Sequence, residues 1–160
     1  MHSPTHLFVI PGAALSLLGL LVALVSLSRL EIFGREWQLH SMIGGSLLGI
    51  VGVQVLALGL CAHAYGRYFM GEREPWFDSM RARFRLEHGL GLGGVILLAG
   101  LVILAVILLT WVDRGFGALS EERLLVGGAT LIIVGLQIVF SSFLLSILGL
   151  RRRDESELRD

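Results

Sequence analysis

The chain has 160 residues, of which 54% are hydrophobic and 16% are charged, and its formal net charge is zero. A soluble domain carries about 25% charged residues, so the composition excludes an ordinary soluble protein and predicts an integral membrane protein of one domain. Cys61 is the single cysteine, which rules out a disulfide or a cysteine-based metal site within the chain.

Four apolar runs are long enough to cross a membrane, since a helix needs about 20 residues to span roughly 30 Å of hydrocarbon. No period-two alternation is present, and four strands cannot close a barrel, so we predict an all-α integral membrane fold. Residues 1–150 then form a four-helix transmembrane domain, and residues 151–160 form a charged cytoplasmic tail. The predicted spans are residues 7–28, 41–65, 89–111 and 124–150.

The distribution of arginine predicts the orientation. All thirteen basic residues are arginine, and nine of them fall on one side of the membrane if both termini share that side. By the positive-inside rule, both termini and the connector between the second and third spans are cytoplasmic. No cleaved signal peptide is evident. The expected location is therefore the bacterial inner (cytoplasmic) membrane, in a multi-pass topology.

The second and fourth spans share a GG-x6-G-x-Q pattern at an offset of 83 residues, which ends at Gln54 and at Gln137. The first and third spans match less closely, with a two-residue slip between their glycines. This similarity predicts two tandem hairpin repeats, arranged as parallel repeats about an axis along the membrane normal.

Small and amide side chains suggest how these helices pack. Four glycines of the second span lie within about 80° of one another on a helix, which permits close approach of another helix. Gln54 lies opposite them, and an interhelical hydrogen bond with Gln137 would contribute about 1 kcal/mol. The predicted helix-packing residues are Gly45, Gly49, Gly52, Gly59, Gln54 and Gln137. A ligand groove along the glycines, or contact of the amides with a lipid, is the alternative.

The connector between the second and third spans has the pattern of an interfacial amphipathic helix over residues 75–86. Pro75 suits the first helical position, and Phe77, Met80 and Phe84 recur at helical spacing. The arginines of this segment lie on a different side of the predicted helix from these apolar residues. Anchoring to an anionic leaflet, at about 1 kcal/mol for each arginine, is one interpretation.

A sharper interpretation combines those arginines with the start of the third span, whose free backbone N–H groups can face an anion. Glu87 would instead cap the helix and pair with an arginine. The residues predicted to bind a lipid phosphate are Arg81, Arg83, Arg85, Glu87, His88 and Gly89.

The sequence offers no catalytic residue, cofactor site or metal site. His40, His63 and His88 are not spaced as a metal-binding pair on one helix. No charged residue lies deep in any span, although proton-coupled transporters generally need one there. A small transporter or a pore is therefore the least favoured class, and no nucleic-acid partner is expected.

Several segments in order carry a family resemblance: Leu7-Phe8 with Pro11-Gly12; His40 with Gly52-Val53-Gln54; Leu86-Glu87-His88-Gly89; Trp111 with Phe116-Gly117; and Gly135-Leu136-Gln137 followed by residues 140–148. With these residues the chain resembles the C-terminal four-helix membrane region of bacterial glycosyltransferase family 2 proteins. Those proteins are similar to dolichol-phosphate mannose synthase and act on polyprenyl phosphate carriers.

The resemblance implies a cytoplasmic catalytic domain with an Asp-x-Asp motif ahead of the membrane region, and this sequence has no such motif. We therefore expect a split or truncated glycosyltransferase, or a membrane module with a separate catalytic subunit. Such a module would anchor the catalytic part and present polyprenyl phosphate at the cytoplasmic face. The alternative is a structural membrane scaffold or homo-oligomerisation protein without a ligand.

Overall fold

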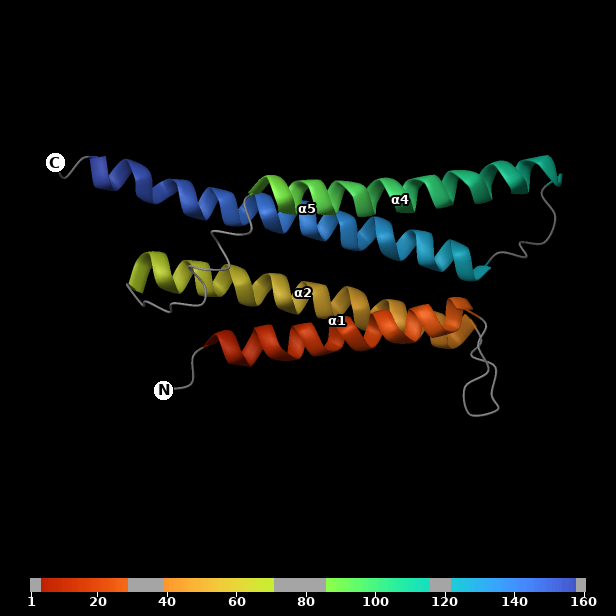
Figure 1. The fold of residues 1–160 in the computed structure, drawn as a ribbon, viewed down its shortest axis with the longest axis horizontal. Coiled ribbons are helices and arrows are strands. Elements are labelled where there is room, and N and C mark those ends of the chain that lie inside the picture. Colours follow the sequence, from red (N-terminus) through yellow and green to blue (C-terminus); the bar gives the residue numbers. More distant parts are fainter. Residues whose placement is uncertain (1–3, 29–38, 71–85, 116–121, 158–160) are drawn as a thin grey trace.

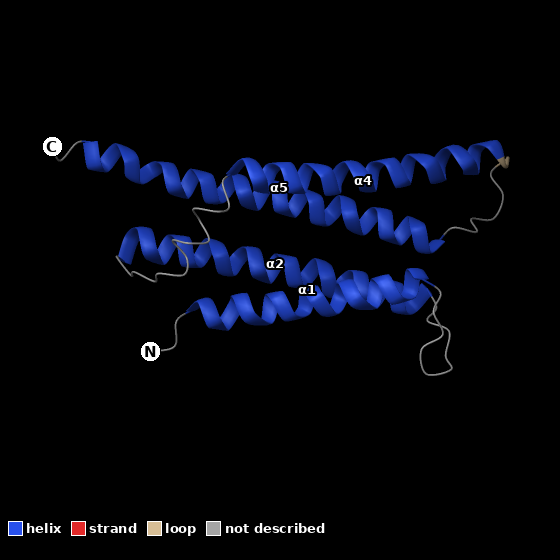
Figure 2. Cartoon of the chain, in the orientation of Figure 1, coloured by secondary structure: helices blue, strands red, loops and turns tan. Residues whose placement is uncertain are grey.

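The computed structural model describes residues 4–28, 39–70, 86–115 and 122–157, and nearly all of them are helical (Figures 1 and 2). The helices are α1 (Pro4–Ser28), α2 (Leu39–Met70), α4 (Leu86–Asp113) and α5 (Glu122–Glu157). Within these ranges there is no strand, so the all-α prediction is confirmed for them.

Each helix contains a stretch long and apolar enough to cross a membrane. These stretches are Phe8–Ser28, Leu39–Tyr65, Glu87–Asp113 and Glu122–Ile147. In hydrocarbon a helix satisfies all its interior backbone hydrogen bonds within one segment, which is why long apolar runs adopt this form. The prediction of four membrane-length helices is confirmed, and the chain is a multi-pass membrane protein.

Two helices extend beyond their apolar stretches. α2 continues to Met70, and α5 continues to Glu157 through part of the segment predicted to be a separate tail. At 1.5 Å per residue α5 is about 54 Å long, well beyond the roughly 30 Å of hydrocarbon. The predicted interfacial helix over residues 75–86 falls outside the described residues except for Leu86, which begins α4.

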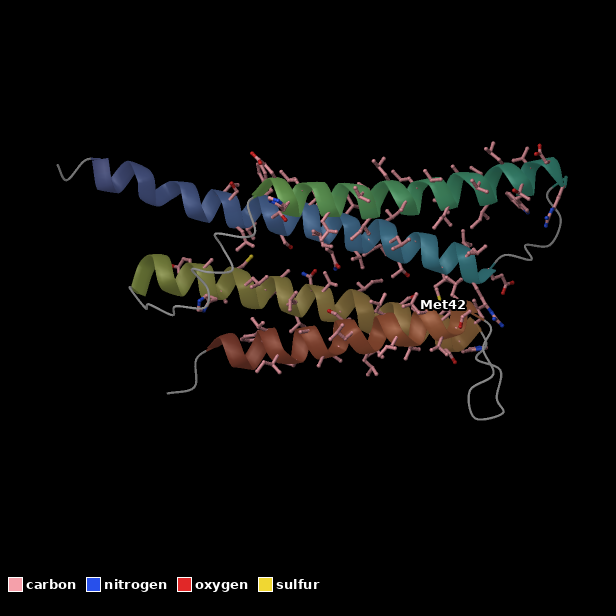
Figure 3. All side chains as sticks on the ribbon, viewed as in Figure 1. Met42 is labelled. Atoms are coloured by element: carbon pink, nitrogen blue, oxygen red, sulfur yellow. The ribbon has the colours of Figure 1, made fainter. Side chains whose placement is uncertain are left out.

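The helices pack in the spatial order α1, α2, α5, α4 (Figure 1). α1 lies along α2, α5 lies along α4, α2 contacts α5 and α1 also touches α5 weakly, whereas the described parts of α4 contact neither α1 nor α2. This layered arrangement has little interior. Large apolar side chains are exposed on both outer helices, for example Leu17 at 63% and Val95 at 66%, as lipid-facing surfaces require (Figure 3).

α1 and α4 begin at one end of the layer, and α2 and α5 end there (Figure 1). We call this end of the layer the Leu86 end, and we call the opposite end the Ser28 end. Near the Ser28 end Met42 is 3% exposed, and its Cε lies 3.3 Å from where a Cβ on Gly127 of α5 would be (Figure 3). The two halves of the chain are therefore in direct contact there.

Candidate functional site

Glycines let α1 and α2 touch backbone to backbone. A Cβ on Gly12 would lie 2.6 Å from the backbone N of Leu56, and one on Gly19 would lie 2.6 Å from the Cα of Gly49. A Cβ on Gly52 would clash with the backbone N of Ser16. No side chain fits at these distances, so glycine is required for this separation of the helices.

The same kind of contact joins α4 and α5. A Cβ on Gly93 would lie 2.9 Å from the backbone N of Val139, and one on Gly100 would lie 2.8 Å from the backbone N of Ile132. On the other helix, a Cβ on Gly135 would lie 2.6 Å from the backbone N of Leu97. Each pair of helices thus has glycines on both partners at the crossing.

The structure places the remaining glycines of the predicted α2 stripe against α1 as well. A Cβ on Gly45 would lie 2.8 Å from the backbone N of Ala23, and one on Gly59 would lie 2.8 Å from the Cβ of Phe8. Gly49 is less constrained, because the nearest atom to its Cβ position is the carbonyl carbon of Gly19 at 4.0 Å. A Cβ on Gly44 would meet nothing within 4 Å.

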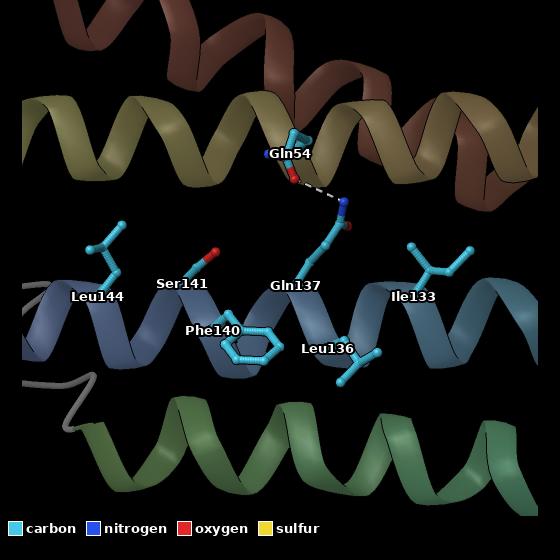
Figure 4. Close-up of a pocket in the computed structure, with 7 residues that line it drawn as sticks. All are labelled: Gln54, Ile133, Leu136, Gln137, Phe140, Ser141 and Leu144. Carbon is cyan, nitrogen blue, oxygen red and sulfur yellow. Dashed lines mark hydrogen bonds between the residues drawn. The ribbon is translucent and has the colours of Figure 1, made fainter.

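Gln54 and Gln137 meet between α2 and α5. The Nε2 of Gln137 donates a hydrogen bond of 2.9 Å to the Oε1 of Gln54 (Figure 4). Gln54 is otherwise exposed, whereas the Oε1 of Gln137 is buried and has no hydrogen-bond partner among the described residues. The pair is therefore only half satisfied.

An open groove of about 350 Å³ lies beside this pair, along α5. Ser141, Leu144 and Ile133 reach from α5 toward α2, as Figure 4 shows. The groove is lined by Gln54, Ile133, Leu136, Gln137, Phe140, Ser141 and Leu144. Sequence reasoning did not identify this groove, although Ser141 follows Gln137 by four residues and so shares its helix face.

At the Leu86 end, the first turn of α4 carries two of the predicted phosphate-binding residues. Glu87 and His88 are exposed, and Gly89 is in direct contact with the Oγ of Ser142 on α5. Ser142 follows Ser141 in the chain but points about 100° away around the helix, so it meets α4 while Ser141 points toward α2 (Figure 4). Arg81, Arg83 and Arg85, which precede this turn in the sequence, lie outside the described residues.

At the Ser28 end, an arginine joins the two halves of the chain. The Nη1 of Arg123, in the first turn of α5, donates to the backbone O of Ser26 at 3.3 Å. Ser26 is fully buried near the end of α1, where the helix carbonyls favour a cation. Arg123 falls between the predicted spans 89–111 and 124–150, and the sequence does not predict this contact because it depends on how the hairpins dock.

The described residues contain no group of His, Cys, Asp and Glu that could hold a metal ion. His40 and His88 begin two different helices at opposite ends of the layer (Figure 1). Four membrane-length helices with glycine crossings, a polar pair between them and a groove beside that pair define an integral membrane module.

Comparison with known proteins identifies the module. The model of the glycosyltransferase family 2 C-terminal transmembrane region matches residues 60–149, and the chain belongs to this family. The resemblance seen in the sequence is confirmed. The match covers α4, the end of α2 and the α5 wall of the groove.

A curated relative extends the similarity over most of the chain. The low-salt glycan biosynthesis hexosyltransferase Agl6 of Haloferax volcanii is 35% identical over 149 residues, which are 93% of this chain. The chain spans 36% of the length of that relative. No solved structure matches the chain. The chain thus corresponds to the membrane region of glycosyltransferases of this family.

Proposed function

We propose that this module anchors a glycosyltransferase catalytic domain or partner subunit to the bacterial inner membrane and presents polyprenyl phosphate to it at the cytoplasmic face. The observation that carries the proposal is the family match over residues 60–149, which includes the arginine segment and the start of α4. The relative is named a hexosyltransferase, which supports a sugar-transfer system. In this proposal both termini and the Leu86 end face the cytoplasm.

The geometry at the start of α4 supports a phosphate there. The first four N–H groups of a helix have no partner within the helix, and they carry the positive end of the helix dipole. His88 is exposed in this turn, and Gly89 holds the turn against α5. The preceding arginines would supply bidentate hydrogen bonds and charge to the phosphate, since arginine suits that geometry. Glu87 would cap the helix or orient one of these arginines.

We infer further that the two hairpins, α1–α2 and α4–α5, are tandem repeats. The glycine contacts support this, because they agree after an offset of 81 residues in the first helix and 83 in the second. Gly12 on Leu56 corresponds to Gly93 on Val139, and Gly19 on Gly49 corresponds to Gly100 on Ile132. Chance similarity of apolar sequences does not require matching contacts. In this view the repeat supplies the scaffold, and the segment between the hairpins is added to it.

Binding of undecaprenyl phosphate to the full chain in nanodiscs tests the proposed function. The triple variant Arg81→Ala/Arg83→Ala/Arg85→Ala should bind at least about tenfold more weakly, because each charged contact contributes on the order of 1 kcal/mol. The matched control is Arg151→Ala/Arg152→Ala/Arg153→Ala, which removes the same charge on the same predicted side and should bind as wild type does. If both triple variants bind equally, the arginines provide only general attraction, and the phosphate site is wrong.

A structural scaffold without a ligand is the second candidate, and the close glycine crossings favour it. Gly44→Leu distinguishes the two, because a Cβ on Gly44 meets nothing within 4 Å in the same chain, whereas Gly49 lies in the α1–α2 crossing. Loss of assembly with lipid binding intact would support the scaffold, whereas co-purification of the chain with a soluble glycosyltransferase subunit would count against it.

A further inference from the structure

α2 lies inside the layer, between α1 and α5, and yet one stripe of its surface is exposed along the helix. Leu47 is 57% exposed, Val51 50% and Leu58 56%, and Gln54 between them is exposed as well. These four residues recur at spacings of four, three and four, which is the heptad spacing by which parallel helices pack side by side. We call them the α2 stripe, and their spacing suits contact with another helix.

α5 continues this surface. A second row of exposed apolar side chains runs along α5 at spacings of three, four, three and four residues: Ile133, Leu136, Phe140, Phe143 and Ile147. The first three of these line the groove together with Gln54, so both rows lie on one face of the layer, which we call the α2–α5 face. The five apolar residues of α5 and the three of the α2 stripe are each about half exposed, and together they offer roughly the 800 Å² that each partner of a stable dimer buries.

Gln54 distinguishes a protein partner from lipid on this face. Its Oε1 accepts the hydrogen bond from Gln137, and its Nε2 pairs with no atom of the described residues. The unpaired Oε1 of Gln137 is buried, so the capacity open to another molecule belongs to Gln54. Exchanging O and N in the two amides still leaves Gln54 with unused capacity. A hydrocarbon chain offers no partner to this amide, whereas a polar side chain of another helix does.

Topology favours a second copy of this chain as that partner. Copies of one membrane protein insert in the same direction, so a two-fold axis between two copies runs along the membrane normal, and residues near the axis meet their own counterparts at the same depth. A carboxamide carries both donors and acceptors, and the Oε1 of Gln54 keeps a second lone pair beside the one that Gln137 uses. Gln54 is therefore self-complementary across such an axis. α2 and α5 also run in the same direction, so all helices of the α2–α5 face would pack in parallel (Figure 1).

We propose that the α2–α5 face binds a second copy of the chain to form a parallel dimer, in which the Gln54 side chains of the two copies hydrogen-bond to each other near the two-fold axis. The α2 stripes of the two copies pack together along this axis, and the exposed row of α5 packs beside them. This inference goes beyond the proposed function and does not depend on the binding of a lipid phosphate.

Energy transfer between donor- and acceptor-labelled copies of the full chain, titrated over the protein-to-lipid ratio in phosphatidylcholine vesicles, measures the dimer Kd. Gln54→Leu should raise this Kd about tenfold or more, because both copies lose the hydrogen bond at the axis. Gln137→Leu is the matched control, since it removes the same bond within the chain but keeps the amide of Gln54, and it should change the Kd less than about threefold. Equal effects of the two variants overturn the contact between the Gln54 side chains, and a wild-type chain that stays monomeric overturns the dimer.

Disulfide cross-linking tests which face is covered. In a Cys61→Ser background, Leu58→Cys places a single thiol on the α2 stripe, and oxidation in vesicles should link most of the chain into dimers. Leu17→Cys is the control, because Leu17 is 63% exposed on α1, outside the α2–α5 face, and it should form few linked dimers. Leu47→Cys should behave like Leu58→Cys, as the heptad spacing requires. Equal cross-linking at Leu17 and Leu58, or stronger cross-linking at Leu17, shows that the copies do not meet through this face, and the inference is then wrong.

Discussion

The two hairpins of this protein share their crossing geometry and differ where the helices approach the Leu86 end. Gly52 meets the backbone of Ser16 in one hairpin, and Gly135 meets the backbone of Leu97 in the other. Toward the Leu86 end, Leu58 and Gly59 of α2 correspond to Ser141 and Ser142 of α5 at the offset of the proposed repeat. The shared glycine contacts show what holds each hairpin together. The serines of α5 show that polar groups near the Leu86 end belong to the second hairpin.

The difference extends to the partner helices. In α1–α2 a large residue, Phe8, packs on Gly59, whereas in α4–α5 Gly89 packs on Ser142. Each of these two contacts includes a glycine, which lets the helices approach closely. Only the contact between Gly89 and Ser142 brings a hydroxyl to the start of a helix. The second hairpin therefore carries the polar end and the wall of the groove, while the first contributes Gln54.

The largest effect is expected from a side chain at a backbone contact. Gly19→Ala would place its Cβ 2.6 Å from the Cα of Gly49 and should lower the free energy of unfolding by about 1–3 kcal/mol, since overpacking forces the helices apart. Gly44→Ala is the control, because its Cβ would meet nothing within 4 Å. That control should be neutral or stabilising by up to about 1 kcal/mol. Unfolding of the purified chain in mixed micelles measures the free energy of unfolding of both variants. Equal effects of the two changes would contradict a close crossing of α1 and α2 at Gly19.

A test of the repeat compares equivalent glycines. Gly52→Ala and Gly135→Ala should each cost about 1–3 kcal/mol, because both Cβ atoms would press on backbone N atoms of the partner helix. The same micelle unfolding experiment reads both variants. If one change is costly and the other is tolerated, the hairpins do not share a crossing, and the repeat interpretation is broken.

The link between the hairpins should contribute less than the glycine crossings. A double-mutant cycle on Gln54→Leu and Gln137→Leu should give a coupling energy of about 0.6 kcal/mol, the average for interhelical hydrogen bonds in membranes, and at most about 1.7 kcal/mol. Each single variant leaves one amide without its partner, so the double variant should be more stable than the sum of the singles predicts. Additive effects would show that the amide bond contributes nothing to the docking of the hairpins.

The smallest effect is expected where the hairpins differ. Ser142→Gly should change the free energy of unfolding by less than about 1 kcal/mol, because the contact with Gly89 involves only a small side chain. The reciprocal change Gly59→Ser should cost more, since its Cβ would lie 2.8 Å from the Cβ of Phe8. Equal magnitudes would mean that the two ends of the hairpins are packed alike.

Much of the scaffold was predictable from the sequence, because long apolar runs have few stable forms in hydrocarbon. The four helices and the family followed from such runs and from the order of residues such as His40, Gln54 and Gln137. The hydrogen bond between the two glutamines matches the packing role expected from their matching positions. The ends of the helices were harder to predict, and α5 continues past the expected boundary at Leu150.

The groove and the contact of Arg123 with Ser26 were not predictable. Both depend on residues that are far apart in the chain and on the angle at which α2 meets α5. Periodicity assigns a face to each residue of a helix, but it does not say which helix covers that face.

The sequence by itself therefore determined the class of protein, the number of membrane helices and the residues able to make close crossings, because hydrocarbon imposes helical structure on apolar segments and only glycine permits backbone contact. The tertiary structure decided that the helices form a layer in the order α1, α2, α5, α4 and that the amide pair lies beside a groove. Those features arise from how the hairpins dock, which is set by a small balance of packing and hydrogen bonds across one interface.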